Sequence, residues 1–330
     1  MPRDLDEREL RILHVAQEAF DALKHVERPL LVNGRSSAWE ELPAWNRWKV
    51  GLSSAHRWPQ ETDLDAVLLR LLPEKAAMNL AIQAVAARMT KRAELWIVGT
   101  NDEGVKSWLK RLSPWFDDVE TVLFKRHCRL LRAFRTSEEL GLKGSLESWQ
   151  EKHEILIDGN TTSWVSYPGL FAKGAVDPAT SLLLETLSGE KFKRSVLDFC
   201  AGQGVISAVL KHRQPDLSIH ALDSDALAQA AFEVNVPYVR FFLSDAWRSV
   251  PPQNRYSAII SNPPIHQGKA EDQRVLQELI EQSPRWLERR GVLWIVTQRR
   301  ILMEKRLSSV FKYVSCVAQN NRFWVWKAQN

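Results

Sequence analysis

The sequence predicts an α/β fold of two tandem Rossmann-like domains, the second with a seven-stranded, mostly parallel sheet ending in an antiparallel hairpin. Three observations predict the layered sheet. Short apolar runs alternate with helical patterns, a glycine-rich turn follows one run at 196–204, and only residues 319–322 join the last two runs. A link this short cannot form a parallel crossover, so these strands must be antiparallel.

A polar stretch at 136–163, which contains three glycines, separates two apolar-rich halves of the chain. Such a change in composition is typical of a linker between domains. We therefore expect a boundary near residue 140, with a first domain over 1–140 and a second over 141–330.

The elements of the first half follow from the spacing of apolar residues. Four leucines and a valine at i, i+3, i+4, i+7 and i+8 predict an amphipathic helix over 64–72 that stops at Pro73. The other elements expected here are strands at 29–33 and 94–98 and helices at 75–89 and 105–112.

The second half alternates more regularly. Nearly continuous apolar strands joined by helices indicate a parallel sheet that is covered on both faces. Helices with apolar faces are expected at 227–234 and 276–287. The expected strands are a hairpin at 153–157 and 163–167, five core strands at 195–199, 218–222, 239–243, 257–261 and 292–296, and the closing pair at 313–318 and 323–327.

Composition limits the class of protein. Of 330 residues, 45% are hydrophobic and 26% charged, which is typical of a globular protein and excludes a collagenous or wholly disordered chain. The net charge of +5 permits a polyanionic partner without requiring one. Three distant cysteines and no CxxC pair predict neither a disulfide framework nor a metal site. With no signal peptide and no apolar run that spans a bilayer, we expect a cytoplasmic protein without a membrane.

The glycine-rich turn is the first candidate site. Asp198 ends the first core strand of the second half, and Gly202 and Gly204 follow before a helix. Glycines let a ligand approach the backbone closely at the positive end of the helix dipole. A carboxylate here suits an ammonium group and repels a pyrophosphate, which favours S-adenosylmethionine (SAM) over a dinucleotide. The alternative is a tight turn without a ligand.

Two further carboxylates follow the next two strands. Asp223 can accept both ribose hydroxyls of an adenosine, and the alternative is that Asp223, Ser224 or Asp225 only caps the following helix. Both functions can also hold, with Ser224 or Asp225 as the cap while Asp223 binds. Asp245, which precedes Ala246, can accept the adenine amino group, or it can be a solvated loop residue. Both positions lie on the same rim of the predicted sheet as the glycine-rich turn.

The sequence Asn262-Pro263-Pro264 follows the fourth core strand. The prolines fix φ, and Pro263 biases Asn262 towards an extended backbone. A rigid loop of this kind can direct the Asn262 amide oxygen and a proline carbonyl at a planar exocyclic amine, whose lone pair then faces a methyl donor. No strong base is required, because the amine becomes acidic only as it is methylated. The alternative is an ordinary proline turn.

Together these motifs resemble a class I SAM-dependent methyltransferase. Segment 167–171 (YPGLF), Asp177 with 181–184 (SLLL), and 262–268 (NPPIHQG) resemble the bacterial small-subunit (16S) ribosomal RNA guanine-N2 methyltransferase C family, and 95–105 (LWIVGTNDEGV) resembles its amino-terminal domain. The resemblance implies methyl transfer from SAM to the exocyclic N2 of a guanine in 16S rRNA. The partner is then 16S rRNA or the 30S subunit, and we expect a monomer.

The resemblance also implies roles for residues of the second domain. The substrate side would consist of the catalytic Asn262, Pro263 and Pro264 with the base-binding Phe171, Ile265 and His266. The cofactor side would consist of Asp198, Cys200, Gly202 and Gly204 for the methionine end, Asp223 and Ser224 for the ribose, and Asp245 and Ala246 for the adenine.

Two positions depart from the family pattern. Cys200 replaces a usual glycine, and Ile265 replaces a common aromatic residue. The loss of an aromatic side chain removes a stacking surface for the base that is worth about 1–3 kcal/mol. Phe171, Trp247 and His266 are the candidates to replace it.

The first half has the same kind of α/β pattern but neither an Asp-x-x-x-Gly-x-Gly turn nor an Asn-Pro-Pro sequence. The first domain of the family has lost cofactor binding, so we expect 1–140 to be a degenerate methyltransferase domain kept for RNA contact or structural support. Other hypotheses stay open: the same chemistry on large-subunit rRNA, DNA adenine or a protein glutamine, a non-catalytic RNA-binding ribosome-assembly factor, and an NAD-dependent dehydrogenase.

Overall fold

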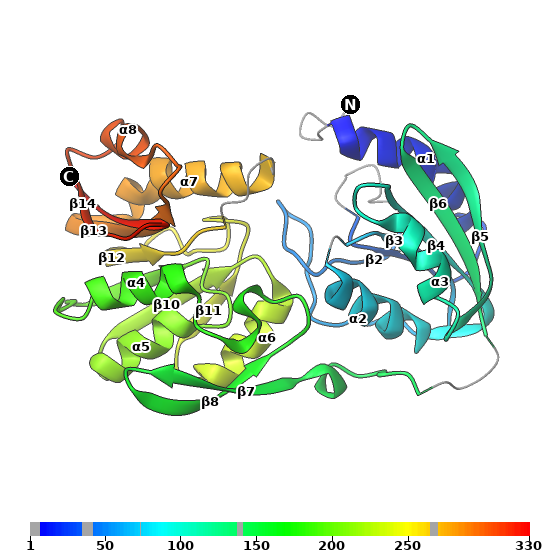
Figure 1. The fold of residues 1–330 in the computed structure, drawn as a ribbon, viewed down its shortest axis with the longest axis horizontal. Helices are drawn as coiled ribbons and strands as arrows, with labels where there is room; N and C mark the ends of the chain where they lie inside the picture. The colour runs from blue at the N-terminus through cyan, green and yellow to red at the C-terminus, as the bar shows by residue number, and fades with distance from the viewer. Residues whose placement is uncertain (1–6, 35–41, 73, 137–140, 265–269) are drawn as a thin grey trace. The chain divides into compact units, whose positions relative to one another are not determined.

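The computed structural model describes residues 7–34, 42–72, 74–136, 141–264 and 270–330 (Figure 1). Contacts within the chain divide it into two compact units. The first comprises Met1–Trp48 and Ser53–Gln150, and the second comprises Lys49–Leu52 and Glu151–Asn330. The short segment Lys49–Leu52 therefore belongs, by its contacts, with the second half of the sequence.

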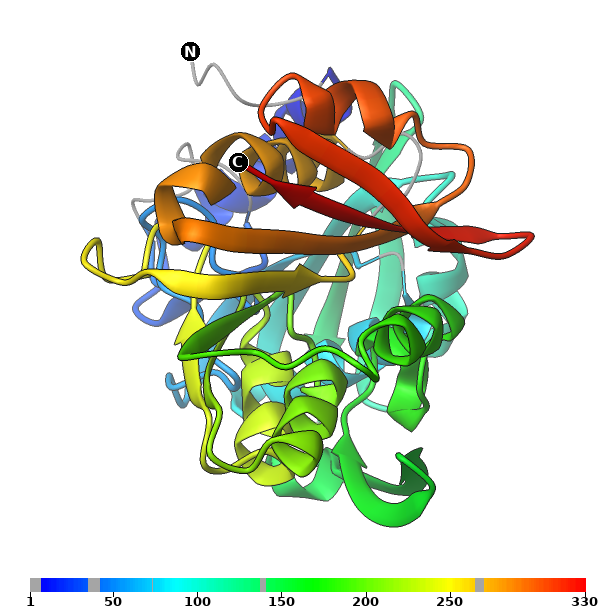
Figure 2. The same ribbon diagram turned by 90° about the vertical axis from the view of Figure 1, so that its left-hand side faces the viewer.

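Seven strands form the sheet of the second unit: β9 (Ser195–Phe199), β10 (Ser218–Asp223), β11 (Arg240–Leu243), β12 (Tyr256–Ser261), β13 (Leu287–Gln298), β14 (Tyr313–Gln319) and β15 (Phe323–Gln329). Their order in the sheet is β11-β10-β9-β12-β13-β15-β14. Pairing is parallel from β11 to β13, and β15 is antiparallel to both β13 and β14. Figure 2 shows this closing hairpin in red beside β13. The predicted mostly parallel sheet with an antiparallel end is confirmed.

Helices cover both faces of this sheet (Figure 1). Neighbouring strand residues point to opposite faces, so Val196 and Leu197 of β9 belong to different apolar clusters. The hairpin β7 (Glu151–Ile157) and β8 (Asn160–Ser166), which the sequence predicts, packs against the cluster of Val196. The same cluster includes residues of α4 (Pro178–Thr186), α5 (Val205–Arg213) and α6 (Ala226–Asn235), and the opposite cluster includes residues of α7 (Ala270–Trp286) and α8 (Met303–Ser308).

The first unit also contains a sheet with an antiparallel end. Its strands are β1 (Pro29–Val32), β2 (Ala44–Trp45), β3 (Leu64–Arg70), β4 (Met89–Thr100), β5 (Phe116–Lys125) and β6 (Cys128–Arg135), in the order β2-β1-β3-β4-β6-β5. Pairing is parallel from β2 to β4 and antiparallel from β4 through β6 to β5. The helices are α1 (Glu7–Leu23), α2 (Lys75–Ala86) and α3 (Trp108–Arg111), with short 3₁₀ turns at Val105–Ser107 and Glu147–Trp149.

The predicted amphipathic helix over 64–72 is wrong, because Leu64–Arg70 forms strand β3 in the middle of the first sheet. Six of its seven residues are buried, as expected for a parallel strand covered on both faces. In so short an apolar run, helical spacing and a doubly buried strand look the same. Two smaller corrections concern helix faces: Val234 of α6 is 52% exposed, and Leu287 begins β13.

The two sheets have the same arrangement of strands around one corresponding strand, which is β4 in the first unit and β13 in the second. β4 and β13 each have 12 residues and contain Leu-Trp-Ile-Val, at 95–98 and at 293–296. Each pairs with a parallel strand on one side, with a register shift near its start, and with an antiparallel strand on the other. The shared sequence and the shared irregularity support a tandem duplication of one fold.

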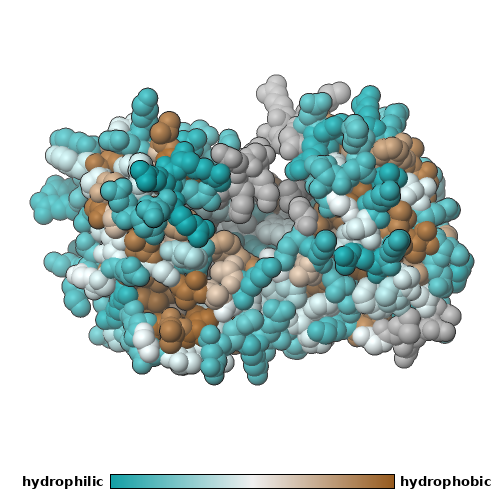
Figure 3. Space-filling model, viewed as in Figure 1, coloured by the Kyte–Doolittle hydropathy of each residue, from teal (hydrophilic) through white to brown (hydrophobic). Residues whose placement is uncertain are grey.

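Hydrophilic side chains cover much of the face that Figure 3 shows, and hydrophobic surface there occurs in smaller patches. In the described part of the chain, no helix combines the length and the apolar character needed to cross a membrane.

Candidate active site

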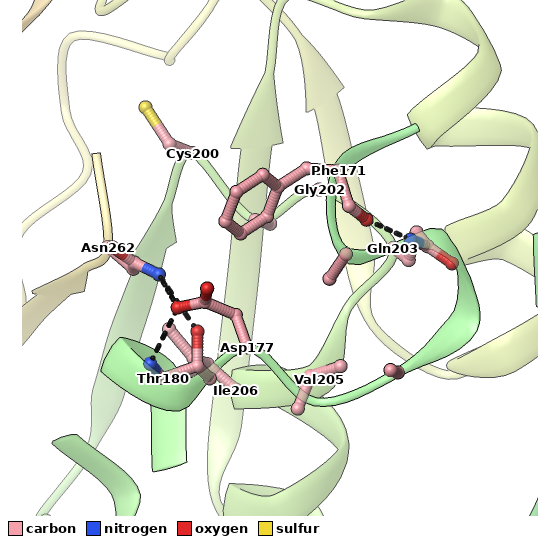
Figure 4. A pocket seen from close by; sticks show the side chains of 12 residues that line it. Phe171, Asp177, Thr180, Cys200, Gly202, Gln203, Val205, Ile206 and Asn262 are labelled. Carbon is pink, nitrogen blue, oxygen red and sulfur yellow. Dashed lines mark hydrogen bonds between the residues drawn. The ribbon is translucent and has the colours of Figure 1, made fainter. Parts of the chain in front are cut away.

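A small pocket of about 50 Å³ lies in the second unit where β9 and β12 end (Figure 4). It brings together the glycine-rich turn, the residue that follows β12, and the start of α4. The lining residues are Phe171, Ala172, Ala175, Asp177, Thr180, Cys200, Ala201, Gly202, Gln203, Val205, Ile206 and Asn262. Two motifs that lie about 60 residues apart in the sequence therefore share one cavity.

Asp198 is fully buried at the end of β9. Its Oδ2 accepts hydrogen bonds from the Ser207 amide at 3.1 Å and the Ser207 hydroxyl at 2.7 Å. Its Oδ1 is buried and has no hydrogen-bond partner among the described residues. Burial raises the pKa of Asp198 to about 7, with a further contribution from the Asp223 carboxylate, even though the Ser207 bonds act in the opposite direction. A buried carboxylate oxygen without a donor fits a cationic ligand.

Gly202 and Gly204 of this turn are glycines for different structural reasons. Gly204 has φ 97°, and a Cβ there would lie 2.7 Å from a Val236 methyl and 2.8 Å from the Phe232 ring. Only glycine allows α5 to begin this close to α6. Gly202 has φ 52° and faces open space, so it leaves room beside the pocket. Cys200, which stands where the resemblance predicts a glycine, also has a left-handed backbone with φ 61°.

Asp223 holds the glycine-rich turn in place. Its Oδ2 accepts the Gly202 amide at 2.9 Å and its Oδ1 accepts the Asp225 amide at 3.0 Å. Burial and the neighbouring Asp225 raise the pKa of Asp223 to about 6. Asp225, and not Asp223, caps α6, because its side chain accepts the Leu227 amide at 2.9 Å. Of the functions that the sequence left open, helix capping therefore belongs to Asp225.

Asp245 is only 3% exposed, so the hypothesis of a solvated loop residue is wrong. Its Oδ1 accepts a hydrogen bond from Arg274 Nη2 at 2.5 Å, and Arg248 Nε lies 3.4 Å from Oδ2. Its Oδ2 also accepts the amide of Gly51 at 2.7 Å, while the Lys49 amide donates to the carbonyl of Ser224 at 2.8 Å. Segment Lys49–Leu52 thus contacts the residues predicted for the adenosine end, next to Ala246, which has φ 47°.

Asn262 follows β12 and lies half-buried beside the start of α4 (Figure 4). Its Nδ2 donates to Asp177 Oδ2 at 3.1 Å and to Thr180 Oγ1 at 2.9 Å. Pro263 is buried and Pro264 is half-buried, as expected for a stiff loop. Ile265 and His266 lie outside the described residues.

Phe171 is 60% exposed and borders the pocket from the 3₁₀ turn Phe171–Gly174. Its carbonyl accepts a hydrogen bond from the Gln203 side chain, which ties this turn to the glycine-rich turn.

Comparison with known proteins decides the family. Residues 161–327 match the family model described as "Methyltransferase small domain", and residues 36–152 match "Methyltransferase small domain N-terminal". The chain belongs to the methyltransferase small domain family. The first range lies in the second half of the chain, which holds the pocket, and the second range lies in the first half.

Its relatives confirm the resemblance to the methyltransferase C proteins. "Ribosomal RNA small subunit methyltransferase C" of Shewanella pealeana is 29% identical over 279 residues, which cover 83% of this chain and 80% of the relative. The protein of the same name from Aliivibrio fischeri is 27% identical over 314 residues, 94% of this chain and 90% of the relative. The solved "T. Thermophilus 16S rRNA N2 G1207 methyltransferase (RsmC) in complex with AdoMet and Guanosine" has the same fold, with a TM-score of 0.82, 18% identity, and coverage of 96% and 92%.

The sheet of the first unit differs from the sheet of the second unit at the positions of Asp198 and Asn262. Ile97 pairs with Leu69 and Ile295 pairs with Ser261, so Arg70 occupies the position that Asn262 has after β12. By the same alignment Leu31 occupies the position of Asp198, since Leu31 and Asp198 face equivalent residues of β3 and β12.

Arg70, unlike Asn262, forms buried ion pairs. Its Nη2 lies 2.8 Å from Glu9 Oε1 and 2.7 Å from Glu103 Oε1, and these three side chains are 5–12% exposed. In the first unit, the position that corresponds to Asn262 is therefore part of the packed interior.

The sequence patterns missed several residues around this site. Thr180, Gly51 and Arg274 reach it only through contacts across 82, 194 and 29 residues of sequence. Asp177 before Pro178 is a signal that was available, because an aspartate before a proline marks the start of a helix.

Proposed function

We propose that this protein transfers a methyl group from SAM to the exocyclic N2 of a guanine in 16S ribosomal RNA. The observation that carries the proposal is that Asn262 and the glycine-rich turn line one pocket. The names of the relatives support methylation of small-subunit ribosomal RNA. The T. thermophilus 16S rRNA N2 G1207 methyltransferase, which was solved in complex with AdoMet and guanosine, supports the cofactor and the base.

The residues of the second unit fit SAM at the methionine end. The unpartnered Oδ1 of Asp198 suits the ammonium group, and Gly202 leaves space for close approach of a ligand. We assign Cys200 and Gly204 to the same turn, Asp223 and Ser224 to the ribose, and Asp245 and Ala246 to the adenine. When bound, SAM supplies an electrophilic methyl group on a sulfonium.

On the substrate side, the Asn262 amide oxygen and the Pro263 carbonyl accept the two hydrogens of the guanine amine, and Pro264 stiffens the loop. The lone pair of the amine is then directed away from the loop, towards the donor. The methyl group would leave the sulfonium, which becomes a neutral thioether, as the N–C bond forms; the acceptor oxygens stabilise the positive charge on nitrogen, and one amine proton passes to water. Phe171 provides an exposed ring for the base. We assign Ile265 and His266 to base binding from the sequence alone.

The first domain, which we place at 1–140 with the catalytic domain at 141–330, serves in this proposal as a degenerate copy without cofactor. The Leu31 and Arg70 substitutions support this role. We further propose that the protein works as a monomer in the cytoplasm, where its substrate is 16S rRNA or the 30S subunit.

The test is methylation with labelled SAM of four substrates: deproteinised 16S rRNA, 30S subunits, 50S subunits and DNA. We expect label in 16S rRNA or 30S subunits, recovered as N2-methylguanosine after digestion and mass spectrometry. Label only in 50S subunits or DNA would assign the chemistry to another amine. Failure to bind SAM in a calorimeter would support the assembly-factor hypothesis, and binding of NADH would support the dehydrogenase.

A further inference from the structure

The amide group of Asn262 has two N–H bonds, and both donate within the protein. One donates to Asp177 Oδ2 at 3.1 Å and the other to Thr180 Oγ1 at 2.9 Å (Figure 4). The remaining polar atom of the side chain is the amide oxygen, which is only an acceptor. The side chain can therefore only accept a hydrogen bond from a further group.

The orientation of this amide is fixed by Asp177. The same Oδ2 accepts the backbone amides of Ala179 at 2.8 Å and Thr180 at 3.2 Å, so the helix start holds the carboxylate in place. An ionised carboxylate is an acceptor and never a donor. If the Asn262 amide turned over, its oxygen would face the Asp177 oxygen, the hydrogen bond to Asp177 would be lost, and two acceptors would repel each other; the Thr180 hydroxyl, which can donate or accept, holds the amide in place while Asp177 sets its orientation.

We infer that Asp177 and Thr180 are positioning residues that lock the Asn262 amide with its oxygen available to the substrate amine. This inference rests on the proposed function, and it specifies the substrate as a planar NH2 group, which supplies the hydrogens that a fixed acceptor needs. A substrate group that can only accept hydrogen bonds, such as a ring nitrogen, meets no donor on Asn262.

The capping role of Asp177 and the positioning role can be separated. Serine caps a helix about as well as aspartate, but its shorter side chain does not reach Asn262. Asp177→Ser should therefore keep the thermal stability close to that of the wild type and lower the rate of methyl transfer.

Thr180 offers the sharper test, because valine has the same shape without the hydroxyl. We expect Thr180→Val to lower kcat by about 10–100-fold, since a reacting group displaced by about 1 Å loses rate on that scale. The KM for RNA and the Kd for SAM should change less than about twofold. Thr180→Ser should restore most of the rate, because it restores the acceptor.

Thr186→Val is the matched control on the same helix. The Thr186 hydroxyl donates to the Leu182 carbonyl at 2.7 Å, within α4 and away from the pocket lining. This variant removes one partly buried hydrogen bond of a hydroxyl group from α4 and should leave kcat unchanged. A loss of rate in both valine variants would mean a general effect of weakening α4 and would overturn the inference.

The closing experiment combines Thr180→Val with Asn262→Ala and measures kcat, KM and SAM affinity for both single variants and the double variant. If Thr180 acts through Asn262, the double variant equals Asn262→Ala within about twofold. A Thr180→Val enzyme with wild-type kcat, or a further independent loss in the double variant, rejects the positioning role while the proposed function stands. A wild-type protein that methylates no exocyclic amine rejects the proposed function instead.

Discussion

At the scale of single residues, Asp198 has the most unusual environment in the second unit. It is fully buried, one of its oxygens has no partner among the described residues, and its pKa is raised to about 7. A carboxylate of this kind is stabilised in its ionised form by an incoming cation. Cofactor binding and proton release should therefore be linked at this residue.

We predict that the affinity for SAM rises as the pH rises towards about 7 and then levels off. Well below the pKa, binding to the ionised form should change the Kd by about tenfold per pH unit. Calorimetric titrations between about pH 5.5 and 8 measure this directly. Asp198→Asn, which cannot ionise, should bind more weakly and keep only the smaller dependence below about pH 6 that comes from Asp223. A wild-type affinity that does not change with pH would contradict the assignment.

The same shift has a consequence for stability. The folded pKa of Asp198 lies above the ordinary value of 3.8, so the folded protein holds a proton that the unfolded chain releases. Its contribution to the free energy of unfolding is therefore fully present below about pH 4 and decreases as the pH rises to about 7. Bound SAM opposes this loss because it stabilises the ionised form.

Candidate site residues could be predicted from the sequence where they directly follow a strand that the sequence predicts. Gly202 and Asn262 follow β9 and β12, and the parallel pairing of these two strands brings both residues to one pocket. Thr180 and Gly51 were not predictable, because their contacts join distant segments and leave no periodic signal. The neutralisation of Asp245 by Arg274 was missed for the same reason.

At the scale of elements, the glycine-rich turn separates packing from binding. Gly204→Ala adds a methyl group 2.7 Å from Val236 in a left-handed backbone, whereas Gly202→Ala adds one in open space on the pocket wall. We predict that Gly204→Ala lowers the free energy of unfolding by about 1–3 kcal/mol more than Gly202→Ala does, because steric overlap adds to the backbone strain that both variants have.

Gly202→Ala should cost about 1–2 kcal/mol of backbone strain at most, but it should weaken SAM binding at least as much as Gly204→Ala does. Chemical denaturation and calorimetry on the two variants check the prediction. Equal stabilities for both alanine variants would show that the approach of α5 to α6 does not require Gly204.

Helices and strands could be predicted from the sequence where turn residues near a segment agreed with the spacing of its apolar residues. All five core strands and the closing hairpin formed where the sequence predicts them, although β13 begins five residues before the expected start at 292. β3 was misassigned because a strand buried on both faces has no alternation that distinguishes it from a helix. The hairpin β5–β6 was missed because its residues alternate weakly and four of the ten residues of β5 are charged.

At the scale of the whole molecule, the two units share one pattern of strand pairing, and only the second has Asp and Asn at the positions of Asp198 and Asn262. Arg70, at the position of Asn262, pairs with Glu9 and Glu103 in the interior of the first unit. Removing one partner from a buried ion pair leaves charges without compensation, at a cost of about 3–5 kcal/mol.

We therefore predict that Arg70→Leu lowers the free energy of unfolding by about 3–5 kcal/mol, while SAM affinity under folding conditions stays unchanged. Arg28→Leu is the control in the same unit, since Arg28 pairs with Asp65 at 3.2 Å on the surface and its loss should have little effect on stability. Denaturant titrations of the three proteins give the comparison. A loss of SAM affinity in Arg70→Leu would mean that the first unit contributes to cofactor binding through this cluster.

The most direct measurement is single-turnover methyl transfer by Asn262→Ala, with SAM affinity determined on the same preparation. The account predicts a SAM Kd within about twofold of the wild type and a rate of guanine N2 methylation lower by about 100-fold or more, because positioning of the amine is lost while the donor still binds. A variant that binds SAM and methylates 16S rRNA at the wild-type rate would contradict it.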